Sequence, residues 1–563
     1  MFKHLSGNFR SSEIIIGLIV LIFVIASVYI NPSRFEPFKI PDVFYSFELM
    51  LWVLLASLTV LVFIGTVLFT IITPRPSVML LITLLYWSLF YIVPNTTAGI
   101  ARLNIEQLVF AKTTETRGIF ITEEGWAFRN QGWPSAYLLE NMLRTLLGVD
   151  IVQNAQVLSL VFNLLVPVLI YLLAICAISD IGRSFQSLAI VFFVIPQTYF
   201  FYFFGDFVYG FVLLLLLIML TMEPLTKEVS SKRILTASLV YLSLILGNPI
   251  WSLLLLIILV SRIITYYVFD IIGKSKNAIS NSRSLFYTLV ILTSMFITWY
   301  FYNELAMKAV SPYFLYLIKL ERLSYALSPS TYIRTPYFGE LLYEVLYYVR
   351  YSIFGFSAIL AIMAHIDSLH RKDFRIFQNI TPLLLSSVIP WILLKAMHEE
   401  SFDNRFMVIG TLFTALSSTY FLYNQRYSKR LLKAILAIMF ILTPFSFALM
   451  FYPSLYTQYN HMSDIYGGLF VANFSSSKLP ILGDGFSISI ITFYDPVRNV
   501  YQLSFDPSKF YVVNKPYIVF RSFANQDIRS YIMYKVTWEQ VDKLLMGTHD
   551  LIYNSVFTKA WLG

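Results

Sequence analysis

The sequence predicts a polytopic α-helical membrane protein with about thirteen transmembrane helices and a small α+β domain at its C-terminal end. Apolar residues make up 58% of the 563 residues and charged residues only 13%, whereas a soluble globular protein carries about 25% charged residues. The mean hydropathy is +0.69. The apolar residues also gather in windows of about twenty, the length that spans a bilayer core. Together, these observations exclude a soluble enzyme.

The apolar windows divide the chain into three regions. Residues 1–77 form an N-terminal transmembrane hairpin, 78–452 form the transmembrane core, and 453–563 form the C-terminal domain. The first span, 14–30, is followed by Asn31-Pro32 without a small-residue cleavage pattern, so we interpret it as a signal anchor. The other predicted spans cover residues 49–72, 78–93, 155–178, 188–204, 207–222, 234–246, 250–269, 285–302, 341–366, 380–396, 406–423 and 431–452.

Lysine and arginine collect in alternate connections between these spans. With the N-terminus in the cytoplasm, every inner connection is basic, as the positive-inside rule expects, and the outer connections mix both signs. An odd number of spans then places the C-terminal domain on the extracytoplasmic side of the cell membrane. The net charge of +9 follows this topology and forms no continuous stripe, so no nucleic-acid partner is expected.

Two long polar intervals, 94–153 and 303–340, fall on the predicted outer side. In the first, Tyr137, Met142 and Leu146 recur at helical spacing opposite Glu140 and Arg144. This pattern predicts an amphipathic helix over 132–148 that lies along the membrane surface. The second interval alternates aromatic and charged residues and is compatible with another interfacial helix.

The tail from residue 453 contains short segments rich in β-branched and aromatic residues, with turn formers between them. A helix is predicted over 537–545, with Thr537 as its N-cap. Together these segments predict the α+β domain, with strands at 486–494, 500–505, 510–513 and 517–523.

The common motifs of soluble enzymes are missing. The sequence has no Walker A loop, dinucleotide glycine fingerprint, HExxH or nucleophile elbow, so ATP-driven transport has no support. The single cysteine, Cys176, excludes a disulfide or a cysteine metal site within the chain. The remaining candidates are polar residues at the outer membrane boundary, where a charge is costly.

Four such residues stand out. Asp206, between two apolar windows, suits a base, a metal ligand or a sugar-hydroxyl ligand, and a solvated turn is the alternative. Asn248 lies in a Gly-Asn-Pro break that either lines a cavity or makes a tight turn. Arg405 is suited to bind a phosphate through its planar guanidinium, and the alternative is an ion pair in a solvated loop. Glu123, in the first polar interval, is either catalytic or structural.

Four segments resemble the GT-C superfamily of membrane glycosyltransferases, in particular its archaeal and bacterial members with an extracytoplasmic C-terminal domain. GWPSAYLLENMLRTLLGVD resembles the loop helix that follows the W-P or H-P motif of the family, and TYFFYFFGDFVYGFVLLLLL matches its short outer turn. LILGNPIWSLLLLI resembles the H-P-x-x-x-L break, with Asn248 in place of histidine. HDLIYNSVFTKAW resembles the terminal strand, so the resemblance runs from about residue 78 to the end.

The resemblance implies transfer of a sugar from a polyprenyl-phosphate-linked donor at the outer face, with an acidic residue of the first long loop as base. Where the family has an aspartate, NTTAGIARLNIEQL offers Glu106, so Glu106, with Glu123 or Asp206 as alternatives, is the expected base. Arg405, with Arg102, would neutralise the departing phosphate. Trp133 begins the helix, 133–147, that would roof the cavity, and it joins Asn248 among the substrate-binding candidates.

The expected partners are membrane lipids, the lipid-linked sugar and a glycan, lipid or protein acceptor. No cofactor is required, and a divalent cation is compatible with the acidic candidates. The alternative function is a lipid-oligosaccharide flippase, a polymerase or another transporter, or a catalytically inactive scaffold for envelope assembly. Transporters tend to carry charges within their spans, whereas nearly all spans here are uncharged in the middle.

Overall fold

The computed structural model of the chain describes residues 60, 63–97, 105–117, 133–178, 182–196, 205–222, 231–271, 278–303, 307, 340–371, 375–396, 403–425, 428–458, 462–474, 481–483, 500–502, 518–521, 550–554 and 559–562. The first predicted span, most of the interval 303–340 and the helix predicted over 537–545 lie outside these residues, as do the strands predicted over 486–494 and 510–513.

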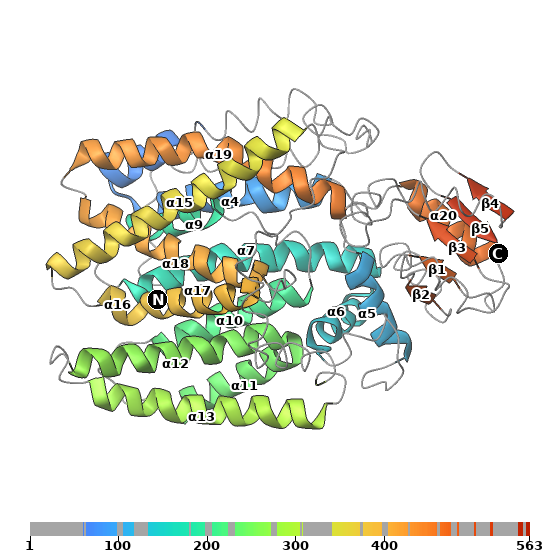
Figure 1. Cartoon of the computed structure of the whole chain (residues 1–563), viewed down its shortest axis with the longest axis horizontal. Coiled ribbons are helices and arrows are strands. Elements are labelled where there is room, and N and C mark those ends of the chain that lie inside the picture. The colour runs from blue at the N-terminus through green and yellow to red at the C-terminus, as the bar shows by residue number, and fades with distance from the viewer. Residues whose placement is uncertain are drawn as a thin grey trace.

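The described part of the chain is a bundle of helices whose axes run side by side, with a small sheet at one end (Figure 1). Each predicted span from residue 78 to residue 452 contains a helix. The helices are η3 (Leu68–Ile72), α4 (Pro76–Thr97), α5 (Ile105–Arg117), α6 (Ser135–Leu147), α7 (Ile151–Ala177), α8 (Arg183–Gln186), α9 (Leu188–Val194), α10 (Asp206–Met222), α11 (Ser231–Gly247), α12 (Pro249–Ile271), α13 (Ala278–Tyr302), α15 (Glu340–Arg371), α16 (Arg375–Asn379), α17 (Thr381–Ala396), α18 (Asp403–Asn424), α19 (Lys429–Gln458) and α20 (Met462–Phe474).

Among the described residues, five helices are long and apolar enough to cross a membrane: Gln153–Ala177, Pro249–Val268, Leu285–Tyr302, Ser352–Arg371 and Arg405–Asn424. Shorter apolar helices, such as Asp206–Met222, pack between them. The chain is therefore a multi-pass membrane protein.

The centre of the bundle is α18, which packs against α9, α15 and α17. Of its apolar window, 83% is buried, against 28% for α13 at the edge. Its buried face carries small polar residues such as Thr411, Ser417 and Ser418. Small residues let helices approach closely in lipid, where apolar side chains gain little by leaving the solvent.

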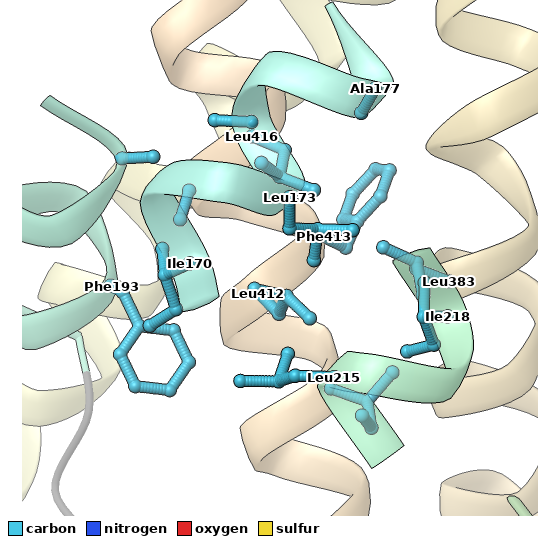
Figure 2. Close-up of a cluster of buried hydrophobic side chains, with 14 of the residues drawn as sticks. Ile170, Leu173, Ala177, Phe193, Leu215, Ile218, Leu383, Leu412, Phe413 and Leu416 are labelled. Atoms are coloured by element: carbon cyan, nitrogen blue, oxygen red, sulfur yellow. The ribbon is translucent and has the colours of Figure 1, made fainter. Parts of the chain in front are cut away.

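Around α18 lies a continuous apolar core (Figure 2). It brings together side chains of α7, α9, α10, α17 and α18, and Ile170, Phe193, Leu215, Leu383 and Leu412 are all fully buried. These helices come from distant parts of the sequence. The core thus fixes the relative positions of the helix ends that form the candidate site.

Helices α5 and α6 cover the end of the bundle that lies nearest the sheet (Figure 1). The expected helix in the first polar interval is confirmed as α6, whereas α5 was not predicted. In α6, Glu140 is buried at 2% exposure, while Met142 and Leu146 are 62% and 77% exposed. Glu140 is buried because α6 packs against α5, α7, α10 and α11. The position of this helix along the membrane surface stays a prediction.

The sheet has five strands: β1 (Ile481–Gly483), β2 (Val500–Gln502), β3 (Ile518–Arg521), β4 (Asp550–Asn554) and β5 (Lys559–Leu562). Their order is β2-β1-β3-β5-β4. β1 pairs in parallel with both β2 and β3, and Ile481 lies opposite Val500 and Ile518. β5 runs antiparallel to β3 and β4. Strands β2 and β3 fall in the predicted strands 500–505 and 517–523. HDLIYNSVFTKAW, which was expected to contain one terminal strand, contains β4 and most of β5.

Candidate functional site

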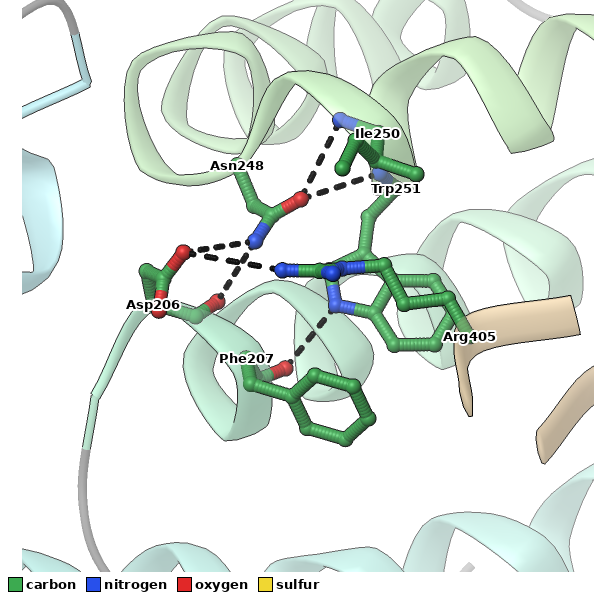
Figure 3. A network of polar contacts seen from close by, with 6 residues as sticks. All are labelled: Asp206, Phe207, Asn248, Ile250, Trp251 and Arg405. Carbon is green, nitrogen blue, oxygen red and sulfur yellow. Dashed lines mark hydrogen bonds and ion pairs between the residues drawn. The ribbon is translucent and has the colours of Figure 1, made fainter. Parts of the chain in front are cut away.

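Three helices begin at one place in the bundle. α10 starts at Asp206, α12 starts at Pro249 directly after Asn248, and α18 starts at Asp403, two residues before Arg405. Figure 3 shows the side chains of Asp206, Asn248 and Arg405 pointing toward one another. Each helix start leaves backbone N–H groups and a partial positive charge.

Asn248 forms the centre of the cluster. Its Nδ2 donates to Asp206 Oδ2 at 2.9 Å, and its Oδ1 accepts hydrogen bonds from the backbone N–H groups of Ile250 and Trp251 at 3.1 and 3.2 Å. The second pair of bonds is an N-cap for α12, which asparagine provides well. Proline at the first helical position needs no N–H partner, so Pro249 completes the helix start. The Gly-Asn-Pro break therefore turns the chain and also orients the Asp206 carboxylate.

Arg405 approaches Asp206 from α18. Its NH2 group lies 3.9 Å from Asp206 Oδ2, and the two side chains are 16% and 15% exposed. The Arg405 guanidinium also lies over the Phe207 ring, with 5.3 Å between Cζ and the ring centroid.

Two glycines allow the helices to come this close. A Cβ at Gly210 would lie 2.3 Å from Trp251 Cδ1 and 2.9 Å from Asn248 Cβ. A Cβ at Gly247 would lie 2.6 Å from Tyr209 Cε1 and 3.0 Å from the hydroxyl oxygen of Ser135. The cluster therefore depends on side-chain-free positions on both α10 and α11.

The start of α6 adjoins the same cluster. The Ser135 hydroxyl donates to the backbone oxygen of Ser243 at 3.1 Å, and Ser135 contacts Gly247, the neighbour of Asn248. Trp133 lies two residues before Ser135, and its side chain is half-buried. This contact places the start of α6 beside the Asp206 cluster.

Of the residues expected from the sequence, Asp206, Asn248 and Arg405 come together. Glu106 lies in the first turn of α5, and its side chain is not among those that the structure describes. Glu123 and Arg102 fall outside the described residues. Their proposed roles stay predictions.

Phe207, Trp251 and Ser135 were not foreseen from the sequence. Trp251 Nε1 donates to the Phe207 backbone oxygen at 2.9 Å, and the two rings meet edge to face with centroids 5.2 Å apart. For Phe207 and Trp251, the signal in the sequence that could have identified them was their closeness to Asp206 and Asn248. Trp251 follows Asn248 by three residues, one helical turn, and Phe207 directly follows Asp206.

Of the acidic candidates that would suit a divalent cation, the structure describes only the side chain of Asp206. No group of three or more histidine, cysteine, aspartate or glutamate side chains gathers among the described residues. At the cluster, Asp206 already faces a guanidinium. A hard cation prefers several oxygen ligands and no neighbouring positive charge. The divalent cation expected to be compatible with the acidic candidates stays a prediction.

No protein-family model matches the sequence, and no curated protein matches it either. Solved structures do match. The oligosaccharyltransferase of Archaeoglobus fulgidus in its apo form has a TM-score of 0.52 and 10% identity, over 86% of this chain and 74% of that one. The same enzyme, AglB, in complex with an inhibitory peptide and a dolichol-phosphate has a TM-score of 0.50 and 10% identity, over the same shares.

The complex of that oligosaccharyltransferase with Zn and sulfate has a TM-score of 0.50 and 11% identity. The match covers 75% of this chain but only 62% of the enzyme, less than two thirds of its length. ArnT from Cupriavidus metallidurans bound to undecaprenyl phosphate has a TM-score of 0.49 and 10% identity, over 86% of this chain and 97% of that one. The oligosaccharyltransferase structures with TM-scores of 0.52 and 0.50 confirm the resemblance expected from the sequence at the level of the fold.

Proposed function

Proceeding from the GT-C fold of this chain, we propose that it transfers a sugar from a polyprenyl-phosphate-linked donor to an acceptor at the extracytoplasmic face of the membrane. The observation that carries the proposal is the position of Arg405, beside Asp206 and among the starts of three helices. Helix N-termini and an arginine fork both bind phosphate. The AglB structure, which holds a dolichol-phosphate, supports a lipid-phosphate ligand for this fold.

The proposal includes the topology expected from the sequence. About thirteen spans place the N-terminus in the cytoplasm and the C-terminal α+β domain outside, on the same side as the intervals 94–153 and 303–340. The common location of α5, α6 and the sheet at one end of the bundle supports this arrangement (Figure 1).

The reaction is a displacement at the anomeric carbon of the sugar. The acceptor oxygen bonds to that carbon while the bond from the carbon to the phosphate oxygen breaks, and the phosphate leaves with the bonding electrons. Arg405 and the helix starts of α10, α12 and α18 stabilise the negative charge that develops on this oxygen. No nucleotide is needed, because the lipid phosphate already activates the sugar.

The acceptor proton passes to a carboxylate. Asp206 is the candidate that belongs to the described cluster, and the amide of Asn248 holds its Oδ2 atom. Glu106 and Glu123 remain alternatives for the same role. A positioned general base contributes about 10² to 10⁴ in rate.

The test uses purified protein in nanodiscs and a panel of polyprenyl-phosphate sugars, with donor consumption and product formation followed together. Arg405→Gln should lower the transfer rate about 100- to 1000-fold, the usual cost of removing one group that stabilises a developing charge. Asp206→Asn should lower it strongly as well. Wild-type protein that flips the donor across a proteoliposome membrane without sugar transfer would favour the transporter instead.

A second cluster of the same residue types provides matched controls. Arg371 Nε lies 2.9 Å from Asp367 Oδ2, which also accepts a hydrogen bond from Asn424 Nδ2 at 2.7 Å. Asn424 ends α18, whereas Arg405 lies at its start, so this cluster is at the opposite end of the helix. Arg371→Gln and Asp367→Asn should leave the transfer rate unchanged.

A further inference from the structure

Two consecutive residues at the start of α10 hold Arg405 from different sides. The Asp206 carboxylate approaches its NH2 group, and the Phe207 ring lies beneath its Cζ atom (Figure 3). The ion pair measures 3.9 Å, longer than the 2.7 to 2.9 Å typical of a charge-assisted hydrogen bond. The guanidinium therefore has both a carboxylate and an aromatic ring as neighbours, and both come from the first two residues of α10.

Phe207 is itself held in place by Trp251. The indole of Trp251, with no exposed surface, meets the Phe207 ring edge to face and donates to the Phe207 backbone oxygen. Trp251 is fixed in turn by the Asn248 cap on its backbone N–H and by the space that Gly210 leaves for its ring. A connected set of contacts thus runs from the break before α12 to the guanidinium.

We propose that Phe207 is a positioning residue, whose ring holds the Arg405 guanidinium in place for the phosphate of the lipid-linked donor. The phosphate part of this statement rests on the proposed function. The attraction arises because the face of an aromatic ring is negative and a guanidinium is weakly hydrated and flat. In a partly dry site such a contact corresponds to about a two- to thirtyfold effect on an equilibrium.

The experiment compares Phe207→Leu, which keeps an apolar side chain but removes the ring, with Phe207→Trp, which restores a ring. Phe185→Leu is the matched control, because Phe185 also belongs to an aromatic pair, with Tyr423 at a centroid distance of 5.5 Å near the other end of α18. Folding of each variant is checked by its thermal midpoint in nanodiscs.

The first measurement is independent of any substrate. Phenylglyoxal modifies exposed arginines, and mass spectrometry of the peptide with Arg405 gives the rate of its modification. Phe207→Leu should raise this rate about two- to thirtyfold, Phe207→Trp should return it to the wild-type value, and Phe185→Leu should not change it. An unchanged rate in Phe207→Leu would overturn the proposal, whatever the protein binds.

The second measurement is the affinity for a radiolabelled polyprenyl phosphate. Phe207→Leu should weaken it by a similar factor and Phe207→Trp should restore it. If modification is faster but affinity is unchanged, the role of Phe207 toward phosphate is refuted. If modification is faster and even the wild-type protein does not bind polyprenyl phosphate, the contact with Arg405 stands and the proposed function fails.

Discussion

Replacing Glu140 with glutamine should stabilise helix α6 at neutral and alkaline pH. Glu140 is 2% exposed and packs where α6 meets α5, α7, α10 and α11. Burial raises the pKa of its carboxyl from 4.5 to about 8. Among the described residues its Oε1 has no hydrogen-bond partner, and the neighbouring Arg144 pairs with Glu115. The carboxyl is therefore largely neutral at pH 7.

The size of the effect follows from the pKa. Because the pKa is raised in the folded protein, the carboxyl stabilises the packed helix fully below about pH 4.5, and this stability falls as the pH rises toward about 8. At about 1.4 kcal/mol per pH unit, the ceiling of the loss is about 5 kcal/mol. Relaxation of the site reduces such values, so we expect about 2 to 5 kcal/mol at pH 8. Glutamine has no proton to lose and should show no such loss.

Hydrogen exchange of the peptide covering 135–147 measures the local opening of α6 directly. Wild-type protein and Glu140→Gln are compared at each pH from 5 to 9, so that the intrinsic exchange rate cancels. The difference in protection between Glu140→Gln and the wild type should grow with pH and level off above about pH 8. Asp367→Asn, in the cluster at the other end of α18, is the control and should follow the wild type. Equal protection of wild type and Glu140→Gln across the whole range would refute the reasoning.

Other substitutions test the helix contacts at the site. Gly210→Ala should lower the thermal midpoint, at a cost of about 1 to 3 kcal/mol, because its Cβ would meet the buried ring of Trp251 at 2.3 Å. Gly355→Ala, with nothing within 4 Å, should not lower it, and equal midpoints for the two variants would contradict the packing. Asn248→Asp should reduce sugar transfer more than it reduces thermal stability, since it places a second carboxylate against Asp206. A variant that transfers sugar at the wild-type rate would argue against the role of the Asn248 amide.

Much of the bundle is predictable because it depends on local composition. A window of about twenty apolar residues can satisfy its backbone hydrogen bonds in lipid only as a helix. The break before α12 was also predictable from the sequence, because Pro249 lacks a backbone N–H donor and Asn248 is a good N-cap. The charged and polar residues at these boundaries, Asp206 and Arg405 among them, were therefore identifiable from the sequence.

The meeting of these residues was not predictable, because it depends on packing between helices that lie far apart in the sequence. Arg405 lies about two hundred residues after Asp206, and nothing local in either segment indicates their pairing. The burial of Glu140 in α6 was not predictable for a related reason. Spacing identified the helix, but its neighbours decided that Glu140 would be buried and Leu146 exposed.

Helix α5 was missed because its sequence is mixed. IEQLVFAKTTETR contains one short apolar stretch among polar residues, so neither a membrane window nor a clear periodicity stands out. In the structure Leu108, Phe110 and Ala111 are buried against Tyr137 of α6. The helix is thus stabilised by its tertiary partner, which single-sequence patterns do not contain.

Photo-crosslinking tests most directly whether the Arg405 cluster binds a lipid phosphate. A polyprenyl phosphate with a diazirine beside the phosphate is irradiated with the protein in nanodiscs, and the labelled peptides are identified by mass spectrometry. Labels should fall on the starts of α10, α12 and α18 and decrease strongly in Arg405→Gln but not in Arg371→Gln. Labelling at the end of α18 near Asn424, or labelling that Arg405→Gln leaves unchanged, would contradict the proposed site.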